Sequence, residues 1–216
     1  MSAPAPAREP VVDGRQSRTA RSRQAICDAC LDLVQEGVLQ PSADQVADRA
    51  GLSRRSIFHH FGDLAALYDA VVEAGMARCA PLLEEIPRSA SVEERVERLA
   101  AVCARFFEAT TPFRRSMAAQ ALAGSESVKS EAVRVARAML RKQRDDVAEL
   151  FEAELAGLDP AERAEVVEAL AAAVSPGNWE HLRASRGLSL GRVRAAIGRS
   201  LRALLSDAGA EIRSSP

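Results

Sequence analysis

The sequence lacks the features that point to membrane, secreted or strand-rich proteins. It contains no run of about 18 apolar residues, which excludes a membrane-spanning helix, and its N-terminal stretch MSAPAPAREPVVDG lacks the apolar core of a secretory signal. No segment has the alternation of apolar and polar residues that half-buried strands require. We therefore expect a cytoplasmic protein with an all-helical fold and no contact with a membrane.

An excess of charge of one sign is also absent. The 216 residues include 29 Lys and Arg and 30 Asp and Glu, which gives a formal net charge of −1. This balance excludes a generally basic nucleic-acid coat protein, so any contact with DNA must come from a local patch. The hydrophobic content of 47% is sufficient for a substantial core, and the long stretches rich in Ala, Leu, Arg and Glu favour helices.

Cysteine is scarce, and only Cys27 and Cys30 of the four cysteines lie close together in the sequence. A zinc site built on such a CxxC needs a second pair of ligands, and none is nearby. Cys30 shares an apolar helix face with Ile26 and Leu33, and Cys27 lies at its edge. The spacing favours core thiols over zinc or redox chemistry, and we expect no metal and no cofactor.

The N-terminal part of the chain contains strong signals for short helices. Residues 1–18 have no periodicity and are expected to form a flexible arm. A first helix is predicted over residues 21–36, where Gly37 ends it, and Ser42 with Gln45 forms a capping box for a second helix that ends at residue 50. Arginines at the entry to the first helix form a candidate phosphate-contacting arm: Arg15, Arg18, Arg21 and Arg23.

The segment after the second helix is the most informative. Gly51 can adopt the left-handed conformation of a tight turn, and Ser53 is a good N-cap for a third helix over residues 54–61. Two short helices separated by AGLS predict a helix-turn-helix. In the third helix Ile57 and Phe61 are spaced to face the core. The opposite face carries Arg54, Arg55, Phe58 and His59.

The rest of the chain is also predicted to be helical. Asp63 caps a fourth helix that runs toward residue 86 and connects to the second domain. Later start signals are Ser91 with Glu94, Thr111 before Pro112, and Asp159 before Pro160. The helices predicted from these signals and from apolar periodicity cover residues 91–109, 112–122, 126–156, 160–174 and 189–205, with a short segment around Trp179 after a break at residues 175–177.

The block from Arg21 to Val71 resembles the DNA-binding head of the tetracycline-repressor (TetR) family, above all in the run PSADQVADRAGLSRRSIFHHFGDLAAL. The C-terminal two thirds is similar to the family in helix content and lengths. The resemblance implies an all-α fold with a three-helix helix-turn-helix DNA-binding domain at residues 19–66. It also implies a helical ligand-binding and dimerisation domain at residues 67–206, followed by a flexible tail at residues 207–216.

The third predicted helix fits a recognition helix, because arginine can pair bidentately with guanine and discriminate by about 1–3 kcal/mol. The family contacts a phosphate at the position of Ser42. His60 is as well suited to packing beneath the fourth helix as to contacting DNA. A metal site formed by His59 and His60 is disfavoured, because neighbouring residues on a helix point about 100° apart. The candidate DNA contacts are Ser42, Arg54, Arg55, Ser56, Phe58, His59 and His60.

Two positions depart from the family pattern. Many members have a tyrosine whose hydroxyl touches a phosphate where this chain has Phe58, and a lysine at the start of the fourth helix where it has Leu64. Both changes remove a phosphate contact and are expected to weaken DNA binding unless the arginine-rich arm compensates.

A single helix-turn-helix contacts too few base pairs for a unique site, so we expect a homodimer on a near-palindromic double-stranded operator. The resemblance implies a dimer bundle from the last two long helices, although an intramolecular core would have the same apolar pattern. It also implies a small, largely apolar inducer. Candidate pocket residues, several of which suit an ordinary core equally well, are Cys103, Phe107, Phe113, Met117, Met139, Gln143 and Trp179.

Other classes of function are less well supported by the sequence. It has no Gly-rich phosphate loop, HExxH, nucleophile elbow or repeated Glu-x-x-His set, so we expect no enzymatic activity. A TetR-like dimer that has lost specific DNA binding and acts through protein contacts is the alternative. Repression rather than activation is inferred from the resemblance alone.

Overall fold

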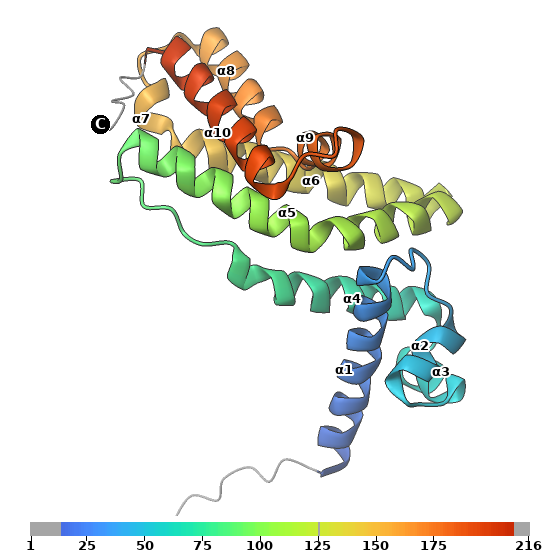
Figure 1. Cartoon of the computed structure of the whole chain (residues 1–216). Coiled ribbons are helices and arrows are strands. Elements are labelled where there is room, and N and C mark those ends of the chain that lie inside the picture. Colours follow the sequence, from blue (N-terminus) through green and yellow to red (C-terminus); the bar gives the residue numbers. More distant parts are fainter. Residues whose placement is uncertain (1–13, 125, 210–216) are drawn as a thin grey trace, which may run out of the picture. The chain divides into compact units, whose positions relative to one another are not determined.

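The computed structural model describes residues 14–124 and 126–209, and all regular structure in these ranges is helical (Figure 1). The chain divides into two compact units, with the division between Met76 and Ala77. Within the described ranges, no helix is both long and apolar enough to cross a membrane.

The N-terminal unit consists of short helices around a small apolar core. Its elements are α1 (Gly14–Gln35), α2 (Ala43–Ala50), α3 (Arg54–Phe61) and most of α4 (Leu64–Cys79). α2 packs against both α1 and α3. The fully buried side chains are Ile26, Cys30, Val46, Ile57 and Leu67, each at 0% exposure. This shared core holds α2 and α3 in a fixed arrangement.

The first helix begins earlier than the sequence predicts. α1 starts at Gly14, so residues 14–18, expected as part of a flexible arm, are helical. The prediction was wrong there because the start was placed where apolar periodicity begins, whereas Arg, Gln and Ala in GRQSRTA are good helix formers without an apolar face. Residues 1–13 of the expected arm lie outside the described residues.

The C-terminal unit is a larger helical bundle. Its elements are η1 (Ala80–Leu82), α5 (Val92–Ala123), α6 (Glu126–Leu150), α7 (Glu152–Leu155), α8 (Pro160–Ala173), α9 (Pro176–Glu180), η2 (His181–Ser185) and α10 (Leu190–Asp207). α10 packs against α5 and α8, and α6 packs against α5 and α8 (Figure 1). The largest buried side chains of this bundle are Trp179, Phe151, Leu155, Leu170, Ile197, Leu201 and Leu205.

The predicted break between residues 91–109 and 112–122 is wrong, because α5 continues through Pro112. A proline inside a helix removes one backbone donor and crowds the preceding turn. Here Thr110 donates its hydroxyl to the Phe106 carbonyl at 2.8 Å, and Thr111 donates to the Phe107 carbonyl at 2.6 Å. Buried residues lie on both sides of the proline, so packing along the whole helix outweighs the local stop signal.

The helix predicted over residues 126–156 is instead divided at Phe151, which separates α6 from α7. The Glu154 backbone N–H bonds to the Phe151 carbonyl rather than to that of Leu150. The freed Leu150 carbonyl accepts a hydrogen bond from Arg95 Nη1. A side chain from α5 therefore takes the place of a helical hydrogen bond, which periodicity within one segment cannot reveal.

The chain's last described helix agrees closely with its prediction. Ser189 caps α10 by accepting from the Arg192 backbone N–H. The helix ends at Asp207, and of the predicted tail at 207–216, residues 210–216 lie outside the described residues.

Candidate functional site

The turn between α2 and α3 is fixed by local hydrogen bonds. Ser42 Oγ accepts from the Gln45 backbone N–H at 3.3 Å, and Gln45 Oε1 accepts from the Ser42 N–H at 2.9 Å, which confirms the capping box. Gly51 adopts the left-handed conformation at φ 65°, and Ser53 Oγ accepts from the Ser56 N–H at 3.1 Å. A positive φ is costly for residues with a Cβ, so glycine suits this turn.

The two faces of α3 differ as the spacing predicts. Ile57 and Phe61 are buried in the core of the unit, whereas Arg54, Arg55 and His59 are exposed. The structure thus brings six of the seven candidate DNA contacts onto α3 and places the seventh, Ser42, exposed at the start of α2. Of the rest, Ser56, Phe58 and His60 are half-buried.

Arg54 is held loosely by two neighbours. Its Nη1 lies 3.2 Å from Asp44 Oδ2 on α2, and its guanidinium carbon lies 5.6 Å from the centre of the Phe58 ring. Both charged side chains are more than half exposed, so the ion pair contributes about 1 kcal/mol or less. A phosphate or a guanine could therefore replace Asp44 at small cost.

His60 lies where α3 meets α1. Arg23 of α1 donates to the His60 carbonyl, and its guanidinium carbon lies 4.2 Å from the centre of the Phe61 ring. Burial lowers the pKa of His60 from 6.5, and the charges of His59 and Arg23 lower it further. His60 therefore carries less positive charge at neutral pH than a free histidine.

Tyr68 of α4 is a positioning residue that the sequence reasoning missed. Its hydroxyl donates to the Pro41 carbonyl at 2.8 Å, directly before Ser42. Burial raises the pKa of Tyr68, and the neighbouring Cys30 contributes to the shift. The sequence did offer a signal, since Tyr68 is the single tyrosine of the chain and lies in a largely apolar helix. A tyrosine buried there needs a hydrogen-bond partner for its hydroxyl.

The two close cysteines lie in the core of the N-terminal unit. Cys27 and Cys30 are buried, and burial raises the pKa of Cys30 to about 12, so its thiol stays protonated. Among the residues that the structure describes, no group of three or more His, Cys, Asp or Glu side chains could hold a metal ion.

The seven candidate pocket residues do not share one environment in the C-terminal unit. Phe107 and Trp179 are buried, with ring centres 5.9 Å apart, and Cys103 is buried on α5. Gln143 donates to the Val174 carbonyl, whereas Met139 on α6 is 49% exposed. The other two, Phe113 and Met117, are half-buried on α5.

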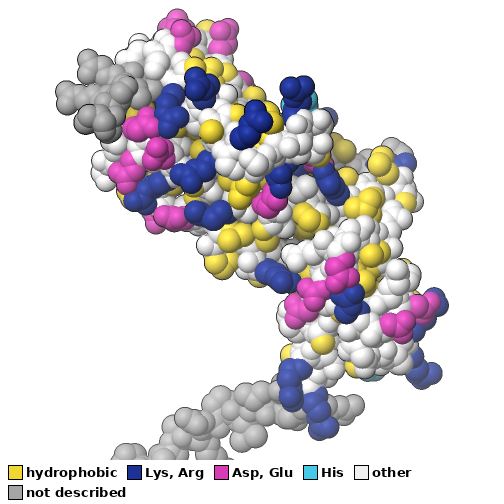
Figure 2. All heavy atoms as spheres, viewed as in Figure 1, with side chains coloured by type: hydrophobic (Ala, Val, Ile, Leu, Met, Phe, Trp, Pro, Cys, Tyr) yellow, Lys and Arg dark blue, Asp and Glu magenta, His cyan; other side chains and the backbone are white. Residues whose placement is uncertain are grey.

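A surface groove of about 210 Å³ lies elsewhere on the same unit. Its lining contains none of the seven candidates and consists of Glu84, Glu94, Glu97, Arg98, Ala101, Arg105 and Arg194. On the face drawn in Figure 2, basic and acidic side chains of the C-terminal unit alternate with apolar ones rather than gathering into a patch of one sign.

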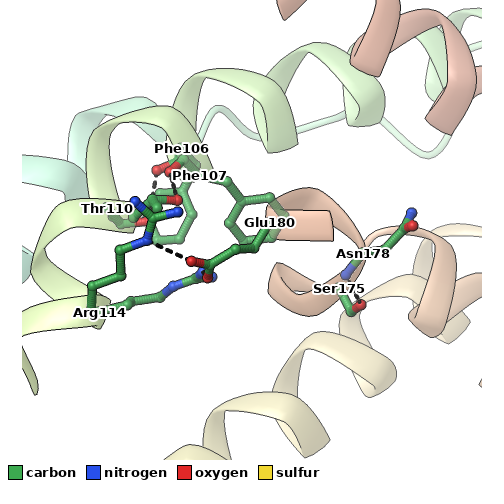
Figure 3. Close-up of polar contacts among 9 residues, drawn as sticks. Phe106, Phe107, Thr110, Arg114, Ser175, Asn178 and Glu180 are labelled. Carbon is green, nitrogen blue, oxygen red and sulfur yellow. Dashed lines mark hydrogen bonds and ion pairs between the residues drawn. The ribbon is translucent and has the colours of Figure 1, made fainter. Parts of the chain in front are cut away.

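Arg114 of α5 is a second residue that the sequence reasoning missed. Its guanidinium carbon lies 5.7 Å from the centre of the Phe107 ring, and its Nη2 lies 3.3 Å from Glu180 Oε2 of α9 (Figure 3). Because the chain is rich in arginine, an arginine on a helix is ordinarily expected to lie in solvent, and Arg114 did not stand out. The signal that could have found it is its place seven residues after Phe107, on the same helix face.

A helix-turn-helix with two exposed arginines at the start of its second helix, followed by a larger helical unit, is typical of DNA-binding transcriptional regulators. The family model described as "Bacterial regulatory proteins, tetR family" matches residues 33–71, which include α2, the turn and α3. Over residues 33–71 the chain therefore matches the DNA-binding region of the TetR family of bacterial regulators.

Solved structures of transcriptional regulators have the same fold as this chain. One is a tetR-family transcriptional regulator from Streptomyces coelicolor, with a TM-score of 0.62, 19% identity, and coverage of 88% of this chain and 82% of that chain. Another is a transcriptional regulator from Rhodococcus sp. Rha1, with a TM-score of 0.64, 19% identity, and coverage of 89% and 100%. No curated protein sequence matches the chain.

Proposed function

We propose that the protein is a ligand-responsive repressor that binds a near-palindromic operator as a homodimer. The observation that carries the proposal is the exposure of Arg54 and Arg55 on the first turn of α3, whose opposite face is anchored in the core. Arginines held on a rigid element can pair with guanine edges in the major groove. Ser42 at the start of α2 is the proposed phosphate contact beside them.

The homodimer part of the proposal is supported by the outer faces of α8 and α10. These helices pack together through their buried faces and leave the opposite faces exposed. Most exposed positions of α8 carry alanine or glutamate, and those of α10 include several arginines and alanines. Small residues allow close approach, and the two charges are complementary, so α8 of one subunit can pack beside α10 of another. The exposed charged positions include Glu162, Glu165 and Glu168 of α8 and Arg192, Arg194 and Arg199 of α10.

The effector part of the proposal places the ligand between α5 and α9. Phe107 and Trp179 meet there, and both are among the pocket candidates. An effector releases the operator only if it binds more tightly to a conformation in which the two α3 helices of the dimer no longer fit successive major grooves.

Selection of bound DNA from a random duplex pool tests the regulator itself. We expect the parent protein to enrich a near-palindromic motif, and Arg54→Ala and Arg55→Ala to weaken binding to that motif about tenfold or more. Arg141→Ala is the matched control, because Arg141 is an exposed arginine on α6. It should leave affinity unchanged.

The alternative, a relative that acts through protein contacts, gives a different result. It is supported if the parent enriches no motif at either low or moderate salt. If the parent does enrich a motif, and Arg54→Ala and Arg55→Ala bind it as the parent does, the result contradicts the contacts assigned to these two arginines. Phe58 and Leu64, which lack the polar groups of their counterparts in many family members, would then explain the loss.

A further inference from the structure

We propose that Arg114 recognises the carboxylate of a small effector with an apolar body, and that this carboxylate takes the place of Glu180 on the Arg114 guanidinium. The inference rests on the proposed function, because it names the chemistry of the proposed effector. It concerns the α5–α9 contact drawn in Figure 3.

The guanidinium of half-buried Arg114 has one buried donor that no other group in the described part of the chain uses. Its Nη1 is buried and has no hydrogen-bond partner among the described residues. Its Nη2 reaches Glu180 at 3.3 Å, which is long for a charged hydrogen bond. A buried donor without a partner is destabilising, more so when it is charged, and such groups are rare in folded proteins. An incoming oxygen would remove this cost.

The charges around Arg114 are also incompletely balanced. Glu180 is shared with Arg115, whose Nε lies 2.5 Å from Glu180 Oε1, so one carboxylate faces two guanidinium groups. Burial is the main cause that lowers the pKa of Arg114, and Arg115 lowers it further, while Glu180 only partly offsets them. A second carboxylate would complete two ion pairs, one with Arg114 and one with Arg115.

The surroundings favour a monocarboxylate over a phosphate. Phe107 and Trp179 supply an apolar wall beside Arg114, and Met117 lies half-buried one turn further along α5. The hydroxyls of Thr110 and Thr111 are already bonded to backbone carbonyls of α5. A phosphate needs several donors at once, whereas a carboxylate matches the fork of one guanidinium.

The position of Glu180 would couple such binding to the rest of the bundle. Glu180 is the last residue of α9, and η2, a π-helical turn, follows it directly. π-helical turns are rare in proteins, and those that occur are often found at functional sites. α9 and η2 connect α8 to α10, the two helices that form the proposed dimer bundle. Releasing Glu180 from α5 therefore acts on the segment between these two helices.

Trp179, the only tryptophan of the chain, provides a direct readout of binding. We would titrate the full-length protein with monocarboxylates from acetate to decanoate, and with benzoate and phenylacetate. Each acid is compared with its primary amide, which has the same body without the charge. Trp179 fluorescence measures binding, and fluorescence anisotropy of labelled operator DNA measures release.

Two variants identify the residue responsible. Arg114→Met keeps an unbranched apolar side chain and removes the guanidinium, and it should raise the half-saturating concentration about tenfold or more. Arg105→Met is the matched control on α5, because Arg105 is exposed and pairs with Glu84 at 3.0 Å. It should respond to carboxylates as the parent does.

The inference is supported if at least one carboxylate, but not its amide, changes Trp179 emission and releases the operator, and if Arg114→Met loses this response. It is overturned if no acid in the series gives a response, if an amide acts as strongly as its acid, or if Arg114→Met responds like the parent. Operator binding without any carboxylate tests the proposed function separately, since a parent that binds carboxylates but selects no operator contradicts only that function.

Discussion

At the residue scale, Phe58 illustrates how a single atom can set the strength of the proposed DNA contact. Phe58 is half-buried on α3, beside the guanidinium of Arg54. Phe58→Tyr adds the hydroxyl that many family members have, and we expect about fivefold tighter operator binding from one new hydrogen bond to a phosphate. Because the hydroxyl is neutral, the dependence of log affinity on log salt concentration should keep its slope.

Titration of labelled operator at several salt concentrations measures both quantities. Phe58→Leu is the control, since it changes the ring without adding a donor and should not tighten binding. An unchanged affinity for Phe58→Tyr would mean that this position does not approach a phosphate.

The buried ion pair between Arg95 and Glu154 contributes to the stability of the C-terminal unit. Their side chains are 6% and 10% exposed, and Arg95 also donates to the Ala90 and Leu150 carbonyls. Glu154→Gln leaves a buried guanidinium without its countercharge, so we expect the free energy of unfolding to fall by about 3 kcal/mol. Urea denaturation followed by circular dichroism measures this change.

Glu149→Gln is the matched control for that experiment. Glu149 pairs with Arg88, but its side chain is 55% exposed, so its removal should cost less than about 1 kcal/mol. Equal losses in the two variants would contradict the role assigned to burial of the Arg95–Glu154 pair.

Sequence reasoning succeeded at residues whose environment is decided locally. The capping box of Ser42, the positive φ of Gly51 and the exposure of Arg54 all depend on neighbours within a few residues, and the structure confirms them. Arg95 and Arg114 were missed because their partners lie far away in the sequence, at Glu154 and on α9.

At the element scale, two exposed or half-exposed ion pairs connect α5 to the end of the chain. Arg202 of α10 donates to Glu93, and Arg183 of η2 donates to Glu108. Hydrogen bonding to these arginines is the main cause that lowers the pKa of Glu93 and of Glu108 below 4.5. The stability that each pair contributes is thus present above pH 4.5 and is lost as the pH falls through the lowered pKa.

Thermal unfolding between about pH 6 and pH 3 tests this dependence. Arg202→Met and Arg183→Met should each reduce the loss of melting temperature on acidification relative to the parent protein. If the melting temperature of both variants depends on pH as that of the parent protein does, the two ion pairs do not contribute to acid sensitivity.

The element boundaries that failed have a common physical cause. Pro112 predicted a helix end, and unbroken periodicity predicted a single helix across Phe151. In both places contacts with other parts of the bundle outweigh the local preference: buried neighbours carry α5 through the proline, and Arg95 interrupts the helix at Leu150. Such contacts join residues more than fifty positions apart, which a pattern in one segment does not contain.

At the scale of the whole molecule, the proposed homodimer should depend on the outer face of α10. Ala195 is exposed and lies on the side of α10 opposite the buried Val193 and Ile197. Ala195→Arg introduces a long charged side chain there, so we expect a shift from dimer to monomer and a loss of operator binding. Sedimentation equilibrium measures the first effect and operator titration the second.

Ala153→Arg is the control, because Ala153 is exposed on α7 and belongs to neither of the two helices of the proposed interface. It should remain dimeric. A parent protein that is monomeric at all concentrations, or an Ala195→Arg variant that stays dimeric, would contradict the proposed interface.

The architecture of the N-terminal unit could be predicted from the sequence in more detail than that of the C-terminal unit. The helix-turn-helix was specified by a dense set of caps, turns and apolar spacings, and the all-helical class followed from the lack of strand patterns. The seven effector candidates could not be tested in this way, because core and pocket residues share the same periodicity. The division of the chain lies inside α4, a continuous helix without a sequence break.

The buried thiols of the two units give the protein its own reporters of local opening. Burial raises the pKa of Cys30 in the N-terminal unit and of Cys103 in the C-terminal unit to about 12. At neutral pH both are protonated and shielded, so alkylating reagents reach them only when the surrounding helices separate. The labelling rate at Cys30 then follows the opening of the helix-turn-helix, and the rate at Cys103 follows the opening of the C-terminal bundle.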